Sequence, residues 1–137
     1  MLKRWQLRWA LAIVCLTWGL AAQALNIEKL DDGTPYIVGG VTKDERKEIE
    51  SLRRMFNMWV QTAASPSGSY LSDVKVTVTN AQGQTVFDQT LDGPWLMAKL
   101  PEGRYRINAV YESQTIRRDV KVLAEKMEPV YFHFNVP

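Results

Sequence analysis

The spacing of apolar residues changes once along this chain, and the change separates a helical segment from a β segment. Apolar side chains recur first at helical spacing, at Ile49, Leu52, Met55 and Phe56. This period predicts an amphipathic helix from residue 43 to about 56. Thr42 followed by Glu45 forms a capping box, and acidic residues crowd the first turn, as the helix dipole favours. The opposite face carries Arg46, Lys47, Glu50, Arg53 and Arg54 and is interpreted as a solvated face.

From Asn57 onward apolar and polar residues alternate, which is the period of half-buried strands. Turn residues interrupt this pattern and leave seven segments, at about 57–63, 74–79, 84–90, 95–100, 104–112, 115–123 and 130–134. Short strands with turns every eight to twelve residues are typical of a sandwich. We therefore expect a mainly β fold, a seven-stranded antiparallel β-sandwich over residues 57–137, preceded by one amphipathic helix over residues 42–56.

Residues 25–41 have no clear period and are expected to form an extended strap. Its one apolar piece is Tyr36-Ile37-Val38. Asp31-Asp32-Gly33 lacks the further ligands of a calcium loop and is interpreted as a turn. An open sandwich has edge strands that can accept another strand, unless the strap covers one of them.

The N-terminus has the form of a signal peptide over residues 1–24. Lys3, Arg4 and Arg8 precede a short apolar stretch, and Ala22-Gln23-Ala24 supplies a small-x-small cleavage pattern. The apolar stretch is shorter than the roughly 20 residues of a spanning helix, so cleavage after Ala24 is favoured over an uncleaved anchor. We expect a periplasmic or secreted protein with no membrane span after cleavage.

The composition of the exported part excludes several classes of protein. Removal of three basic residues from 17 leaves 14 Lys and Arg against 15 Asp and Glu, a net charge of −1. A general nucleic-acid binder is therefore not expected. The single cysteine leaves with the signal segment, so no disulfide can hold the fold.

A motif near the middle of the chain is similar to a known family. It runs aromatic, apolar, then Leu-Pro-x-Gly-x-Tyr-x-Ile-x-Ala, and comprises Trp95, Met97, Leu100, Pro101, Gly103, Tyr105, Ile107 and Ala109. From about residue 70 to the end, the chain resembles the carboxypeptidase regulatory-like domain, a prealbumin-like (transthyretin-like), Ig-like β-sandwich, here in a small exported bacterial protein. The resemblance implies a fold but says very little about function.

The orientation of Trp95 has two interpretations. Strict alternation groups Leu96, Ala98 and Leu100 inside the sandwich and leaves Trp95 and Met97 outside. The resemblance implies instead that Trp95, Met97 and Leu100 all point inward, with an irregularity between them. On that basis we expect the Trp95 indole to fill the space between the two sheets, close to Tyr105 and Ile107. The alternative is a ligand platform.

Residues for catalysis or metal binding are sparse, so no catalytic, metal or cofactor-binding residue is expected. His133 is the only histidine, and it shares a phase with Tyr131 and Asn135, opposite Val130, Phe132 and Phe134. We therefore expect it to face solvent. A zinc site usually needs three or four Cys, His or carboxylate ligands, and no nucleophile-elbow motif surrounds any serine. The hydroxyisourate hydrolases of the transthyretin-like fold need several histidines, which this chain lacks.

Three surfaces are candidates for binding. If Ser113-Gln114 closes a two-residue hairpin, Arg106 faces Lys121, Asn108 faces Asp119 and Val110 faces Arg117. The outer face is then mainly basic, through Arg104, Arg106, Arg117 and Lys121, and could meet an anionic envelope polymer or an acidic partner; the alternative is an ordinary mixed-charge face. The loop 64–73 offers Tyr70 and Leu71, which could equally tuck under the sheet. The outer phase of the last strand offers Tyr131 and His133.

The function expected from these features is a non-enzymatic binding or accessory module of the cell envelope, with an unknown protein or envelope polymer as its partner. One alternative is a structural subunit of an envelope assembly, which an exposed apolar helix face would favour. The other is an enzyme of unrecognised type, for which a deep polar pocket around His133 would speak. Oligomeric state does not follow from the sequence.

Overall fold

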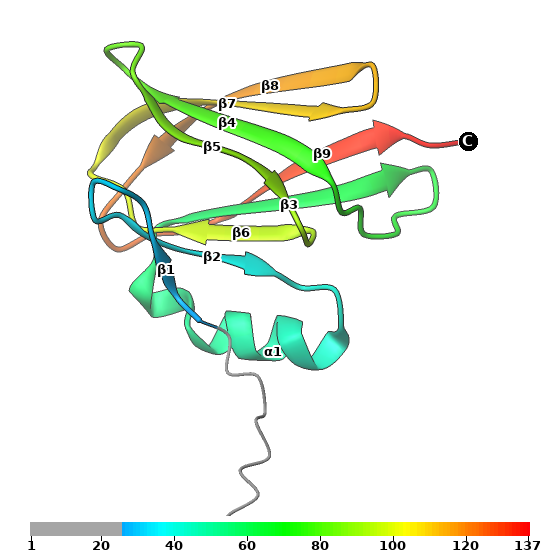
Figure 1. The fold of residues 1–137 in the computed structure, drawn as a ribbon, viewed down its shortest axis with the longest axis horizontal. Helices are drawn as coiled ribbons and strands as arrows, with labels where there is room; N and C mark the ends of the chain where they lie inside the picture. The colour runs from blue at the N-terminus through cyan, green and yellow to red at the C-terminus, as the bar shows by residue number, and fades with distance from the viewer. Residues whose placement is uncertain (1–25) are drawn as a thin grey trace, which may run out of the picture.

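The computed structural model describes residues 26–137, which form three stacked layers (Figure 1). Sheet A is the middle layer, with strand order β1-β2-β6-β3-β9, and sheet B, with order β5-β4-β7-β8, covers one of its faces. The helix α1 covers the other face. The expected signal segment 1–24, with cleavage at Ala24, lies outside the described residues. No helix within residues 26–137 is long and apolar enough to cross a membrane.

The elements in chain order are β1 (Glu28–Lys29), β2 (Pro35–Gly39), α1 (Lys43–Ser51), the 3₁₀ helix η2 (Arg53–Met55), β3 (Met58–Ser65), β4 (Val74–Asn80), β5 (Thr85–Leu91), β6 (Trp95–Ala98), β7 (Gly103–Tyr111), β8 (Gln114–Val122) and β9 (Pro129–Asn135). The mainly β class with two sheets and one helix is confirmed. The number of strands was wrong, because residues 26–137 contain nine. The two extra strands, β1 and β2, come from the segment expected to be an extended strap.

β2 is a strand because of a non-local pairing. It runs antiparallel to β6, from Tyr36 opposite Ala98 to Gly39 opposite Trp95, and β1 pairs with its other edge. The strap thus covers one edge of β6, as the sequence allowed. Gly93 makes this close approach possible, since a Cβ atom there would clash with the Gly39 carbonyl oxygen.

The expectation of a purely antiparallel sandwich was also wrong. β3 and β9 run parallel, from Trp59 opposite Pro129 to Ser65 opposite Asn135. The other paired strands are antiparallel. Parallel neighbours need a long crossover connection, and here the whole of sheet B lies between β3 and β9 in the chain.

Two apolar clusters hold the layers together, one on each face of sheet A. The larger cluster fills the space between the sheets, and its members from sheet A include Met58, Val60, Leu96, Ala98, Phe132 and Phe134, with Leu100 just after β6. Sheet B supplies mainly valines of β4, Phe87, Leu91, Tyr105, Ile107 and Ala109. The smaller cluster lies between sheet A and the helix and contains Ile37, Ile49, Phe56, Trp59, Trp95 and Met97. The three inner strands of sheet A, β2, β6 and β3, therefore divide their odd and even residues between two buried layers.

Trp95 is a core residue, but not in the predicted place. Its exposed fraction is 5%, and it packs in the helix-side cluster with Met97, whereas Leu96 and Leu100 belong to the cluster between the sheets. The prediction that Trp95 lies between the sheets near Tyr105 and Ile107 was wrong. The side chains of β6 do alternate between the two faces of sheet A. The outer face is nevertheless buried, because α1 covers it.

The helix begins where the sequence indicated. The Thr42 hydroxyl oxygen accepts a hydrogen bond of 3.1 Å from the Glu45 amide, so Thr42 is the N-cap. The Glu45 carboxylate accepts a hydrogen bond from the Gly40 amide instead of completing a capping box. The helix ends sooner than predicted, at Ser51, and Met55 was wrongly assigned to its apolar face because η2 turns it outward to 53% exposure.

Candidate functional site: a basic groove between the helix and sheet A

The predicted hairpin face has a different register from the one expected. Tyr111 pairs with Gln114, so the two-residue turn is Glu112-Ser113 rather than Ser113-Gln114. Glu112 adopts a φ of 53°, which allows this tight turn. The shift places Arg106 opposite Asp119, where Lys121 was predicted.

This register makes the hairpin face less basic. Arg106 forms an ion pair of 2.9 Å with Asp119, and this hydrogen bond holds the pKa of Asp119 below its usual 3.8. The Arg117 guanidinium donates a hydrogen bond of 3.2 Å to the side chain of Asn108. Arg104 and Lys121 lie opposite each other on the same two strands. One of the four predicted cations is thus neutralised by an acid, and a second has a polar partner.

The other four predicted binding residues lie in three different environments. Leu71 is half-buried against the cluster between the sheets. His133 is exposed on β9, as predicted, and stacks on the Tyr131 ring with centroids 6.1 Å apart. Tyr70 and Tyr131 are 45% and 51% exposed and line one common groove. The structure therefore brings two of the predicted residues together in one site.

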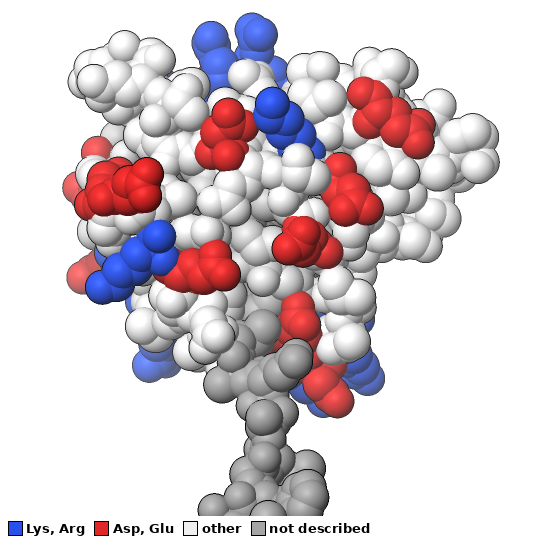
Figure 2. Space-filling view, in the orientation of Figure 1, with Lys and Arg blue, Asp and Glu red and all other residues white. Residues whose placement is uncertain are grey.

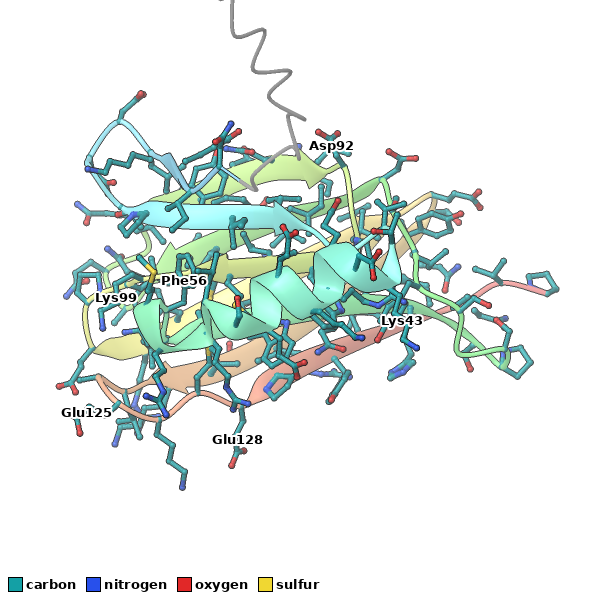
Figure 3. All side chains as sticks on the ribbon, turned by 90° about the horizontal axis from the view of Figure 1, so that it is seen from below. Lys43, Phe56, Asp92, Lys99, Glu125 and Glu128 are labelled. Atoms are coloured by element: carbon teal, nitrogen blue, oxygen red, sulfur yellow. The ribbon has the colours of Figure 1, made fainter. Side chains whose placement is uncertain are left out.

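This basic groove, as we name it, lies on the outer face of sheet A between α1 and β9 and has a volume of about 550 Å³. Figure 3 shows α1 lying across this face with β9 beside it. Side chains of α1 and η2 form one wall, β9 forms the other, and β3 and β6 supply the floor. The lining residues are Lys43, Arg46, Lys47, Glu50, Arg53, Trp59, Gln61, Tyr70, Trp95, Pro129 and Tyr131.

The helix wall of the groove is strongly basic. Four cations, Lys43, Arg46, Lys47 and Arg53, face it together with one acid, Glu50. Within residues 26–137 the only ion pair is Arg106–Asp119, so none of these four cations is neutralised by an acidic side chain of the described chain. Figure 2 shows basic side chains at the bottom of the molecule, where α1 lies, as well as at the top over β7 and β8. Unpaired charge of one sign along a concave wall attracts ligands of the opposite sign.

The floor of the groove is aromatic. The rings of Trp59 and Trp95 meet edge to face with centroids 4.9 Å apart, and Tyr70 meets Trp95 in the same way at 6.1 Å. The guanidinium carbon of Arg46 lies 4.7 Å from the centroid of the Tyr70 ring. Arg46 is further fixed by a 2.8 Å hydrogen bond to the Gly40 carbonyl oxygen. The groove therefore offers rigid aromatic surfaces and a fixed guanidinium.

Two polar groups of this floor have no partner. The indole nitrogens of Trp59 and Trp95 are buried, and neither N–H donates a hydrogen bond within the described structure. A buried donor without an acceptor costs about 1–3 kcal/mol, and buried indoles usually find a partner. Both nitrogens are buried beneath the floor, so its exposed surface is that of the aromatic rings.

Sequence reasoning missed most of this groove. The helix cations had been interpreted as a solvated face, although Lys43, Arg46, Lys47, Glu50 and Arg53 recur at helical spacing on one side. That spacing was the available signal. The pairing of this side with Trp59 and Trp95 could not be read from the sequence, because it depends on how α1 docks on sheet A.

Among residues 26–137, no three His, Cys, Asp or Glu side chains gather closely enough to hold a metal ion. The groove is lined by cations and aromatic faces, and such groups bind anions. No model of a known protein family matches the chain, and no curated protein sequence matches it.

Proposed function

We propose that this protein is an exported, non-enzymatic binding module of the cell envelope, and that it binds an anionic ligand in the basic groove. The observation that carries the proposal is the wall of four cations without acidic partners, placed beside an aromatic floor. Export is inferred from the basic, apolar and small-residue pattern of the N-terminal segment.

The ligand is expected to combine negative charge with flat surfaces. Lys43, Lys47 and Arg53 would attract acidic groups, while the guanidinium of Arg46 is held against Tyr70. Tyr, Trp and Arg together are the residue types most enriched at the energetic centres of interfaces. An acidic polypeptide and a uronate-containing polymer both present carboxylates, which pair well with guanidinium groups.

The rivals of this function have less support. The apolar side of α1, which an assembly would need exposed, is covered by sheet A, and Ile49 is fully buried. His133, the residue on which an enzyme would depend, lies exposed on β9 against Tyr131 rather than at the base of a cavity.

We also propose that the sandwich is of the carboxypeptidase regulatory-like, prealbumin-like type. Two facing sheets and the core positions of Leu100, Tyr105 and Ile107 support this proposal. The helix-side position of Trp95 departs from the inward aromatic that the resemblance implies.

Binding to two carboxylate polymers, polyglutamate and polygalacturonate, tests the function and distinguishes a polypeptide from a polysaccharide source. The triple variant Lys43→Glu, Lys47→Glu, Arg53→Glu should lose binding, by about tenfold or more in Kd at low salt, since each reversal replaces attraction by repulsion. The wild-type affinity should fall as salt rises.

The matched control is Arg104→Glu, Arg117→Glu, Lys121→Glu on the hairpin face. It changes the net charge of the protein by the same amount but leaves the groove intact. Equal loss of affinity in both triple variants would show that only net charge matters, and loss in the control alone would place the site on the hairpin.

A further inference from the structure

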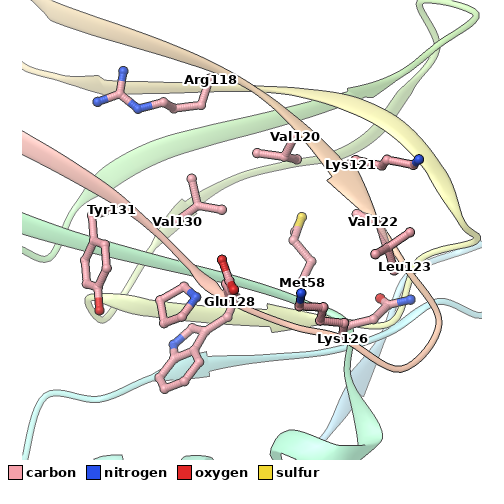
Figure 4. Close-up of a pocket in the computed structure, with 13 residues that line it drawn as sticks. Met58, Arg118, Val120, Lys121, Val122, Leu123, Lys126, Glu128, Val130 and Tyr131 are labelled. Carbon is pink, nitrogen blue, oxygen red and sulfur yellow. The ribbon is translucent and has the colours of Figure 1, made fainter.

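A second surface, which adjoins the basic groove and shares Trp59, Pro129 and Tyr131 with it, lies where the sandwich is open between β8 and β9. Both strands are at the ends of their sheets, and no other strand of residues 26–137 pairs with their outer edges. A slot of about 600 Å³ runs between them, with Met58, Val120 and Val130 inside and Lys121 and Lys126 at the rim (Figure 4).

The outer edge of β9 presents free backbone groups. The amide of Val136 donates a 3.0 Å hydrogen bond to the Ser65 carbonyl of β3. Since direction alternates along a strand, the amides of Phe134 and Phe132 also face β3, whereas those of Tyr131 and His133 face outward. The N–H and C=O groups of these two residues are thus available to another strand.

At Asn135, a side chain already occupies the place that a neighbouring strand would take. The side-chain amide of Gln114 donates to the Asn135 carbonyl at 2.9 Å, and its oxygen accepts from the Asn135 amide at 2.8 Å. This carboxamide makes the two hydrogen bonds that a neighbouring peptide group would make. The pairing stops there, and the edge is open at His133 and Tyr131.

β9 also lacks the features that usually protect an edge. Its sequence from Pro129 to Asn135 contains no Lys, Arg, Asp or Glu, whereas the neighbouring strand β8 carries four charged residues, with Arg118 on its inner side. Edge strands are normally protected by charge, by proline or by being short. Only Pro129, at the start of the strand, serves this role in β9.

We propose that the β9 edge binds an extended segment of a partner protein by strand addition, and that this segment alternates apolar with acidic side chains. Its backbone would pair with Tyr131 and His133. Its apolar side chains would enter the slot against Val120 and Val130, which are half-buried against the cluster between the sheets. Its acidic side chains, on the opposite face, would meet Lys121 and Lys126 at the rim of the slot, where Glu128 is the one acid.

A synthetic peptide that alternates valine with aspartate tests this proposal, with a valine–lysine peptide as its control. The background is the groove variant Lys43→Glu, Lys47→Glu, Arg53→Glu, so that acidic peptide cannot be held by the basic groove. The expected results are binding at least about tenfold tighter for the aspartate peptide and slower hydrogen exchange at the His133 amide in its presence. Unchanged exchange at His133 under saturating peptide would overturn the proposal.

Two variants should act in opposite directions, which a general loss of structure cannot do. His133→Pro removes one outward N–H without touching the bonds to β3 and should weaken binding. Gln114→Ala frees the Asn135 amide and carbonyl for the peptide and should strengthen it. If the wild-type protein instead self-associates through this edge, with His133→Pro monomeric and no peptide bound, a second copy is the occupant and the proposal is wrong.

Discussion

At the scale of single residues, Trp95 combines two properties that were expected to exclude each other. It is buried to the extent of a core side chain, and it also lines the basic groove. Both follow from its place on the helix side of sheet A, beside Trp59. The same indole therefore stabilises the docking of α1 and forms part of the candidate site.

Trp95→Ala should strongly destabilise the protein. Truncation of a buried aromatic side chain costs about 3–5 kcal/mol, through lost transfer energy and a cavity, against a total stability of about 5–15 kcal/mol for a typical domain. Denaturant unfolding measures the loss. Tyr131→Ala, at a position 51% exposed, should change stability by no more than about 0.5 kcal/mol. Equal stability of the two variants would show that Trp95 does not pack in a core.

Asp119 should titrate below its ordinary pKa of 3.8 because of its hydrogen bond with Arg106. A depressed pKa favours the folded state above pH 3.8, and this contribution is lost as the pH falls through the pKa of the folded state. NMR titration of the carboxyl group should show the pKa rise toward 3.8 in Arg106→Gln. A pKa that is the same in both proteins would show that the pair does not persist in solution.

At the scale of elements, the start of α1 depends on one local hydrogen bond. Thr42→Ala should destabilise the protein by about 1 kcal/mol, since the Glu45 amide loses its acceptor. Thr42→Ser keeps an oxygen in place and should differ from wild type by only a few tenths of that amount. Thermal unfolding of the three proteins is the measurement, and indistinguishable curves for alanine and serine would argue against the cap.

Gly93→Ala should separate β2 from β6. The new methyl group would meet the carbonyl group of Gly39, which is backbone and cannot rotate away. Overpacking of this kind costs about 1–3 kcal/mol. Hydrogen exchange should quicken in β2, from Tyr36 to Gly39, whereas Asp92→Ala next to it should leave exchange as in wild type. Unchanged protection of β2 in Gly93→Ala would contradict its pairing with β6.

The features that sequence predicted well are those set by near neighbours. The Thr42 cap depends on residues only a few positions apart. The alternation through β6 is equally local, but the orientation expected for Trp95 followed the resemblance instead of the alternation and was wrong. The predicted hairpin register was wrong because the turn places Glu112 at a positive φ. Gly, Asn or Asp usually marks that conformation in a hairpin turn, and a glutamate gives no such signal. β2 was missed because its identity as a strand comes from β6, some sixty positions later.

At the scale of the whole molecule, the third layer explains both the error over Trp95 and the candidate site. Alternation indicates which side of a strand a residue occupies, but not what covers that side. Once α1 docks on sheet A, it buries Trp95 and brings Lys43, Lys47 and Arg53 over the same surface. The groove thus forms only when α1 packs on sheet A. Of its parts, only the helix wall could be predicted from the sequence, through the helical spacing of its cations.

The most direct test of binding in the groove is NMR of the indole N–H groups of Trp59 and Trp95 during titration with polyglutamate or polygalacturonate at low salt. Variants Trp59→Phe and Trp95→Phe assign the two resonances. If the groove is the site, one or both resonances shift saturably, and the shifts disappear in the variant Lys43→Glu, Lys47→Glu, Arg53→Glu. Indole resonances that stay fixed while backbone amides of the β7–β8 hairpin move would contradict a site between α1 and sheet A.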